Sequence, residues 1–222
     1  MPLFHSASYA YSVAHAGDPL PDSRAEIAFA GRSNAGKSSV INTLAGRRRL
    51  AFVSKTPGRT QMLNFFSLGA GRFLVDLPGY GFAAAPGAVR AQWDALLSNY
   101  LRTREPLRGL VLVMDIRRPL TDLDGQLIEF FRPTAKPIHV LLTKSDKLAR
   151  VKAQAVLRDV SRRLARLSPE YSAQLFSSLA SSGIEEAEAV CASWLGIEMK
   201  TPPGRAAQKP QAEIKKPRAK GG

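Results

Sequence analysis

The sequence contains little cysteine, little histidine and no long hydrophobic stretch. A single cysteine, Cys191, excludes an internal disulfide bond and fits a reducing, cytoplasmic location. The three histidines are scattered, so together with one cysteine they form no metal-binding pattern. The longest purely apolar runs, such as residues 110–114, are far shorter than the ~20 residues of a membrane-spanning helix. The first residues also lack the basic start and apolar core of a signal peptide.

Acidic residues are scarce compared with basic ones. The chain has 32 Lys and Arg against 18 Asp and Glu, a formal net charge of +14. Residues 199–222 hold seven basic residues and one acid, so +6 lies in this tail and +8 in the remainder. Solubility alone would explain a basic tail, but an excess in both parts indicates a polyanionic partner, with nucleic acid as the prediction. The tail has too few apolar side chains to order itself and is predicted to be disordered.

Apolar runs alternate with helical patterns along the body of the chain. Such alternation predicts an α/β fold with a mostly parallel sheet covered by helices on both faces. The expected organisation is a polar, irregular lead-in over 1–22, one domain over 23–198 and the tail over 199–222. Strands are predicted at 26–31, 62–68, 72–77, 109–115, 137–144 and up to 176, and helices at 37–46, 89–101, 123–131, 146–167 and 184–195.

A glycine-bracketed loop lies between the first predicted strand and the first predicted helix. The stretch GRSNAGKS fits the phosphate-binding pattern G-x-x-x-x-G-K-[ST] and comprises Gly31, Arg32, Ser33, Asn34, Ala35, Gly36, Lys37 and Ser38. Its glycines let backbone N–H groups approach phosphate oxygens, and the helix adds its positive dipole end. Lys37 is expected to reach the β- and γ-phosphates and the Ser38 hydroxyl to bind Mg²⁺.

A second motif, DLPG, closes the strand that ends near residue 76. It comprises Asp76, Leu77, Pro78 and Gly79. A carboxylate beside a phosphate loop can hold Mg²⁺ through water, and the Gly79 N–H can meet the γ-phosphate. Alone, the motif is a turn with an aspartate cap. Its position after the phosphate loop favours a nucleotide-hydrolysing site.

A third motif, TKSD, selects the base. Thr143, Lys144, Ser145 and Asp146 follow a buried strand. The Asp146 carboxylate can accept two hydrogen bonds from guanine, whereas adenine has no such pair of donors, so GTP is predicted. The Lys144 stem can lie along the base. After the next strand, backbone N–H groups of Phe176, Ser177 and Ser178 could meet guanine O6.

The loop at 55–61, KTPGRTQ, lies between the first two motifs and begins with the Pro-Gly pair of a turn. A threonine here could add its hydroxyl to Mg²⁺ and order the loop around a γ-phosphate. Thr56 and Thr60 are both candidates, and their spacing does not decide between them.

Together, GRSNAGKSS, KTPGRTQ, DLPGYG and TKSDKL resemble the EngB (YihA/YsxC-type) family of bacterial ribosome-assembly GTPases, among the Era/EngA/TrmE-like G proteins. The resemblance covers about residues 23–195. It implies a Ras-like G domain that hydrolyses GTP with Mg²⁺, a role in maturing the large ribosomal subunit, and a link to cell division and septation. Separately, we expect the protein to be a monomer.

The resemblance also assigns residues. It places the Mg²⁺-binding threonine before the glutamine, so Ser38 and Thr60 become the metal ligands, and Lys37, Thr60 and Gly79 become the catalytic set. The loop residues expected to contact nucleotide are Gly58, Arg59, Thr60, Gln61 and Met62.

Two positions bear on the rate of hydrolysis. Tyr80 follows DLPG where Ras-like enzymes have a water-positioning glutamine, which predicts slow intrinsic turnover. Asn34 matches the asparagine that marks potassium-stimulated relatives, which suggests that K⁺ or the ribosome raises the rate. The alternative is that Asn34 only caps the loop.

Further basic groups are candidates for RNA contact. Arg158, Arg162 and Arg166 are spaced to share one helix face, and Arg47 to Arg49 form a second cluster. A solvated basic face is the simpler interpretation. The functional alternatives are a GTP-gated rRNA-binding module with incidental hydrolysis and an ATP-using phosphotransferase, against which TKSD argues.

Overall fold

The computed structural model describes residues 2–51, 62–80 and 87–198, with only the backbone described over 87–94. Five strands follow one another in the sheet in parallel, in the order β4, β2, β5, β6 and β7, while β3 runs antiparallel between β1 and β4. The strands are β1 (Ser8–Val13), β2 (Ala25–Gly31), β3 (Leu63–Gly69), β4 (Arg72–Asp76), β5 (Leu107–Asp115), β6 (Ile138–Thr143) and β7 (Tyr171–Leu175). The mostly parallel sheet predicted from the alternating pattern is confirmed.

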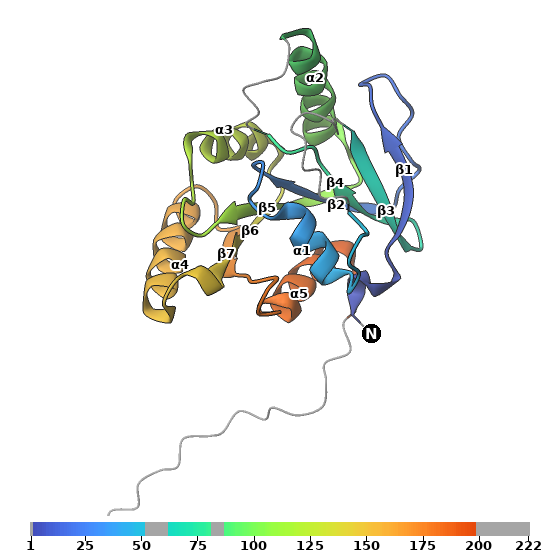
Figure 1. Cartoon of the computed structure of the whole chain (residues 1–222). Coiled ribbons are helices and arrows are strands. Elements are labelled where there is room, and N and C mark those ends of the chain that lie inside the picture. Colours follow the sequence, from blue (N-terminus) through green and yellow to red (C-terminus); the bar gives the residue numbers. More distant parts are fainter. Residues whose placement is uncertain (1, 52–61, 81–86, 199–222) are drawn as a thin grey trace, which may run out of the picture.

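Helices cover both faces of this sheet (Figure 1). The α-helices are α1 (Lys37–Leu44), α2 (Gly87–Thr103), α3 (Asp122–Phe131), α4 (Arg150–Ala165) and α5 (Ile184–Leu195). One core packs α2, α3 and α4 on one face, and a second core packs α1 and α5 on the other. The central strands are buried on both sides, which explains their continuous apolar sequence. Cys191 is fully packed in the second core.

The amino-terminal segment differs from the prediction of an irregular lead-in. Residues Leu3–Ser6 form a 3-10 helix, η1, and β1 pairs with β3 at the edge of the sheet. Phe4 is fully buried against Phe29, and Tyr11 stacks on Phe65. This strand was not predicted from the sequence. An edge strand packs only part of its surface, and SYAYSV is accordingly a mostly polar and exposed stretch.

The predicted helix over 146–167 is also shorter and interrupted. A 3-10 turn, η3 (Ser145–Lys147), comes first, and α4 begins only at Arg150. Lys144 takes a left-handed conformation with φ of 57°, and Leu148 is extended, so the backbone cannot continue as one helix. Among the described residues, every helix is too short or too polar to cross a membrane.

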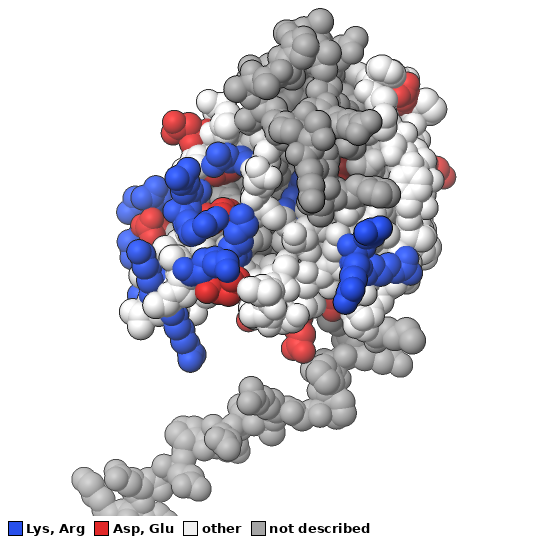
Figure 2. Space-filling view, viewed as in Figure 1, with Lys and Arg blue, Asp and Glu red and all other residues white. Residues whose placement is uncertain are grey.

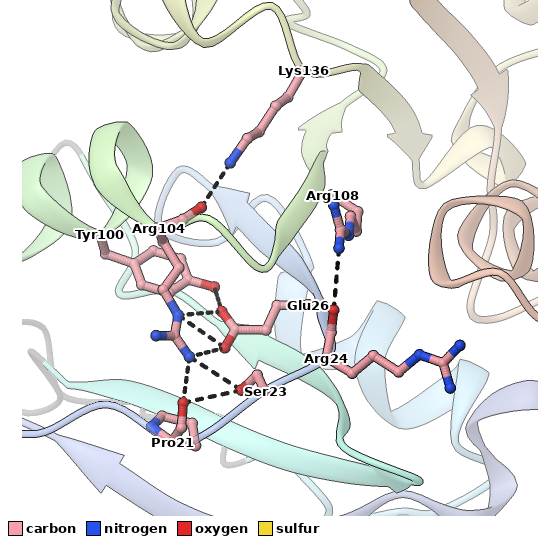
Figure 3. Close-up of polar contacts among 8 residues, drawn as sticks. All are labelled: Pro21, Ser23, Arg24, Glu26, Tyr100, Arg104, Arg108 and Lys136. Atoms are coloured by element: carbon pink, nitrogen blue, oxygen red, sulfur yellow. Dashed lines mark hydrogen bonds and ion pairs between the residues drawn. The ribbon is translucent and has the colours of Figure 1, made fainter.

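A buried polar network joins α2 to the start of β2 (Figure 3). The Glu26 carboxylate is fully buried and accepts hydrogen bonds from the Arg104 guanidinium at 2.6 Å and from the Tyr100 hydroxyl at 2.8 Å. Arg104 also donates to the carbonyl of Pro21, and its own carbonyl accepts from Lys136. The network lies at the opposite end of β2 from the phosphate loop, so it fixes the scaffold rather than the site.

Candidate nucleotide-binding site

The phosphate loop leaves the carboxyl end of β2 and enters α1. A Cβ at Gly31 would lie 2.8 Å from the Val113 carbonyl oxygen, so only glycine lets β2 approach β5 this closely. Gly36 precedes α1 with φ of 101°, a left-handed conformation that favours glycine. Asn34 also has positive φ, at 65°. These conformations curl the loop at the amino terminus of α1, where backbone N–H groups and the helix dipole favour an anion.

The DLPG motif meets this loop through a charge pair. The Lys37 ammonium forms an ion pair with the Asp76 carboxylate at the end of β4, and both side chains are about nine-tenths buried. Ser38 follows Lys37 in the first turn of α1. A hydroxyl and a carboxylate are the oxygen donors that Mg²⁺ prefers, so Ser38 and Asp76 fit a magnesium site. Thr60, like Thr56, Gly58, Arg59 and Gln61, lies outside the described residues.

Backbone contacts extend the sheet beyond β2 and β4. The Ser33 N–H donates to the Tyr80 carbonyl at 3.3 Å, and the Tyr80 N–H donates to the Gly31 carbonyl at 3.4 Å. A Cβ at Gly79 would lie 3.3 Å from the Ser33 hydroxyl oxygen. That hydroxyl is buried and has no hydrogen-bond partner in the described part of the chain. The DLPG motif, as predicted from its sequence position, therefore lies directly against the phosphate loop.

The side chain of Tyr80 points into the protein. It is 8% exposed, and its hydroxyl donates to the Asp124 carboxylate at 2.7 Å. Asp124 also accepts from the Thr121 N–H, closing the capping box of α3. Burial, aided by the charge of Asp124, raises the pKa of Tyr80, so the phenol stays protonated and keeps donating. The link between Tyr80 and Asp124 was not predicted, because the two residues share no sequence motif.

We expect Tyr80→Phe to lower the free energy of unfolding by about 1–3 kcal/mol. The change removes one hydroxyl and leaves a nearly inaccessible oxygen of Asp124 short of a donor. Urea unfolding followed by circular dichroism would measure it. Tyr9→Phe is the matched control, because the Tyr9 hydroxyl makes an exposed contact with Ser12. Equal stability of the two variants would contradict the role given to this hydrogen bond.

The TKSD motif holds the other side of the phosphate loop. The Thr143 hydroxyl donates to the Ala35 carbonyl at 2.6 Å. The Lys144 ammonium donates to the Asn34 carbonyl at 2.8 Å and to the Asp115 carboxylate at 3.0 Å. Arg117 and then Lys144 keep the pKa of Asp115 well below its usual range, so it remains an anion beside them. Asp115 was missed in the sequence because a lone acid at a strand end carries no pattern.

Asp146 is held by the segment after β7. Its carboxylate accepts from the Ser177 hydroxyl at 2.6 Å, which lowers its pKa and keeps it ionised. The N–H groups of Phe176 and Ser177 already donate to the carbonyls of Leu142 and Ser182. Of the three N–H groups considered for guanine O6, only that of Ser178 is uncommitted among the described hydrogen bonds. The segment therefore positions the Asp146 carboxylate through a side chain, a role the sequence did not suggest.

A pocket of about 470 Å³ adjoins the phosphate loop. Arg32 to Ala35, the end of β5 and Lys144 line it, together with Arg117 and Arg118. Met62, by contrast, lies exposed just before β3. The structure thus gathers the first, second and third motifs at the carboxyl edge of the sheet, where ligands bind in open α/β folds.

Comparison with known proteins agrees with this geometry. A family model described as "50S ribosome-binding GTPase" matches residues 26–144. The "Probable GTP-binding protein EngB" of Dechloromonas aromatica is 60% identical over 90% of this chain and 92% of its own, and that of Azoarcus sp. is 61% identical over 88% and 94%.

Solved structures share the fold. A crystal structure of a probable GTP-binding protein engB matches with a TM-score of 0.61 at 23% identity, over 78% of this chain and 99% of its own. Aquifex aeolicus Era bound to GDP.AlF4- matches with a TM-score of 0.62 at 18% identity, over 81% and 59%. The fold is therefore the expected Ras-like G domain, and with relatives of this identity and coverage the chain belongs to the EngB family of GTP-binding proteins.

Proposed function

We propose that this protein binds GTP, hydrolyses it to GDP and phosphate, and acts as a nucleotide switch in large ribosomal subunit assembly in the cytoplasm, with an effect on cell division and septation. One observation carries the proposal: the DLPG and TKSD motifs both contact the phosphate loop, Asp76 through Lys37 and Lys144 through the Asn34 carbonyl. The family match to ribosome-binding GTPases supports the partner.

Guanine recognition rests on Asp146. Its carboxylate is ionised and is oriented by the Ser177 hydroxyl, so it can accept from both guanine N1–H and the exocyclic amino group. A base without these donors would leave the carboxylate unpaired, which is the strongest form of discrimination by hydrogen bonding. An ATP-using phosphotransferase is disfavoured for the same reason.

Hydrolysis would proceed by in-line attack of water on the γ-phosphate. With nucleotide bound, the Lys37 ammonium would exchange Asp76 for the β- and γ-phosphate oxygens and stabilise the charge that develops on them. Ser38, Thr60 and, through water, Asp76 would hold Mg²⁺, which neutralises phosphate charge. The Gly79 N–H, beside Ser33 of the phosphate loop, would hold the γ-phosphate.

The expected turnover is slow, because the Tyr80 phenol donates to Asp124 and cannot take the place of a water-positioning glutamine. We propose that K⁺ near Asn34, or the ribosome, raises this rate. The same observation favours the second candidate, a GTP-gated rRNA-binding module in which hydrolysis only resets the protein.

We expect large ribosomal subunits to stimulate GTP hydrolysis. At equal ionic strength, we also expect the rate of hydrolysis to be higher in K⁺ than in Na⁺. The measurement is phosphate release with and without purified large subunits in each salt, with ATP as the control nucleotide. GTP-dependent subunit binding without stimulation would support the rRNA-binding module. Equal use of ATP, or absence of subunit binding in every nucleotide state, would contradict the proposed function.

A further inference from the structure

The basic excess of the folded part of the chain is concentrated in one place. Residues 147–166 contain seven Lys and Arg and a single acid, a net charge of +6. The tail at 199–222 carries another +6, so all other residues together carry only +2 of the total of +14. Figure 2 shows basic side chains gathered over the side of the molecule that α4 occupies in Figure 1. The body of the protein is therefore basic essentially because of α4 and the turn before it.

The fold of α4 turns this charge outward. Ala153, Val160 and Leu164 are buried and pack the helix onto the sheet beside β7. The solvent-exposed side of the helix carries Lys152, Arg158, Arg162 and Arg163, and Arg166 follows at its carboxyl-terminal cap. Arg158, Arg162 and Arg166 follow one another at intervals of four residues, so they form a row roughly 12 Å long.

Ion pairing does not account for these side chains. The one acid of the face, Asp159, lies 3.0 Å from Arg163 and 3.9 Å from Arg162. Among the described residues, Arg158 and Arg166 have no acidic partner within ion-pair distance. Like charges four residues apart each destabilise a helix by about 0.2–0.5 kcal/mol. The row therefore costs stability.

The helix dipole explains only part of the pattern. Arg162 and Arg163 stand in the last turn, where cations are favourable. Arg150 and Lys152, however, stand in the first turn, where acids are favourable and α4 has none. α3 and α5 have acids in their first turns, whereas α1 and α2, like α4, have none. Helix stability alone would not place cations at both ends of α4.

The basic face is continuous with the guanine-reading loop. Asp146 lies in the turn η3, Lys147 in the same turn lies 3.5 Å from its carboxylate, and α4 begins three residues later. We propose that the outward face of α4, defined by Lys152, Arg158, Arg162, Arg163 and Arg166, is a docking surface for the phosphate backbone of large-subunit ribosomal RNA. This inference rests on the proposed function and adds the surface that meets the RNA.

The test is a triple variant of the full-length protein, Arg158→Gln, Arg162→Gln and Arg166→Gln. Glutamine keeps good helix propensity and removes three charges. The matched control is Arg24→Gln, Arg102→Gln and Arg108→Gln, which removes the same charge from exposed side chains outside α4. Binding to purified large subunits and to protein-free large-subunit rRNA is measured between 50 and 200 mM salt, with GTP affinity and urea unfolding as checks on the fold.

The α4 variant should bind both probes roughly tenfold more weakly at 150 mM salt. The slope of its log binding constant against log salt concentration should be shallower by roughly two to three, because each phosphate contact contributes about 0.7–0.9 to this slope. The control variant should differ little from wild type. If both variants bind equally weakly, or if the α4 variant binds as tightly as wild type, the proposed docking surface is contradicted and the proposed function is not. Weaker binding to subunits alone, with rRNA binding unchanged, would also overturn the docking surface. If the wild-type chain binds neither probe, the proposed function fails and the surface fails with it.

Discussion

Asp146→Asn is expected to weaken GTP binding by roughly 10²–10⁴-fold and to create binding of xanthosine triphosphate. The carboxylate accepts two charged hydrogen bonds from guanine, each worth about 1.5–3 kcal/mol. In the amide, one bond is replaced by an unfavourable contact between two NH2 groups and the other loses its charge, so most of both contributions is lost. Xanthine replaces the exocyclic amino group by a carbonyl, which the new amide can meet as a donor. Titration with labelled GTP and xanthosine triphosphate would measure both affinities.

The control for this change is Ser177→Ala, which removes the 2.6 Å hydrogen bond to Asp146 and leaves the carboxylate in place. We expect this variant to bind GTP about tenfold more weakly and to gain no affinity for xanthosine triphosphate. Ordinary GTP affinity in Asp146→Asn would show that this carboxylate does not read the base. Loss of both nucleotides, with unchanged urea unfolding, would contradict the exchange of specificity.

The part of the site that the sequence predicts is the part built by local backbone geometry. A strand, a glycine-bracketed turn and a helix are contiguous at residues 25–44, so their pattern survives in the linear sequence. The same holds for DLPG and TKSD, each of which ends a buried strand of the parallel sheet. Because parallel strands end at a common edge, their convergence followed from the fold class.

Contacts between distant segments were not predictable in this way. Lys144 bonds to Asp115 and Tyr80 to Asp124, and neither pair shares a sequence pattern. Nor did any pattern indicate that Glu26 is buried. Each depends on which strands become neighbours and on how deeply a polar group is buried. β1 was missed for a related reason, since its place at the sheet edge leaves a half-exposed, largely polar sequence.

The buried network at the amino end of β2, away from the phosphate loop, gives the largest expected effect on stability. Glu26 is fully buried on β2, and Arg104 makes three hydrogen bonds to its carboxylate. Arg104→Met would keep much of the apolar stem but leave a buried carboxylate with only the Tyr100 hydroxyl as a strong donor. Breaking a buried pair by removing one partner costs about 3–5 kcal/mol. Whole domains are stable by only about 5–15 kcal/mol, so a fraction of this variant should be unfolded at moderate temperature.

Urea unfolding would measure the loss, with Arg102→Met as the control two residues earlier, in the last turn of α2. Arg102 is exposed and lies over the ring of Phe130, a contact worth about 0.5–1 kcal/mol. Adding Glu26→Gln to Arg104→Met should recover part of the stability, because the neutral amide costs less to bury and can still accept from Tyr100. If Arg104→Met and Arg102→Met lose the same small amount, the charge pair does not secure α2 to the sheet. A double variant less stable than the sum of both single changes would show that the buried carboxylate is not the source of the cost.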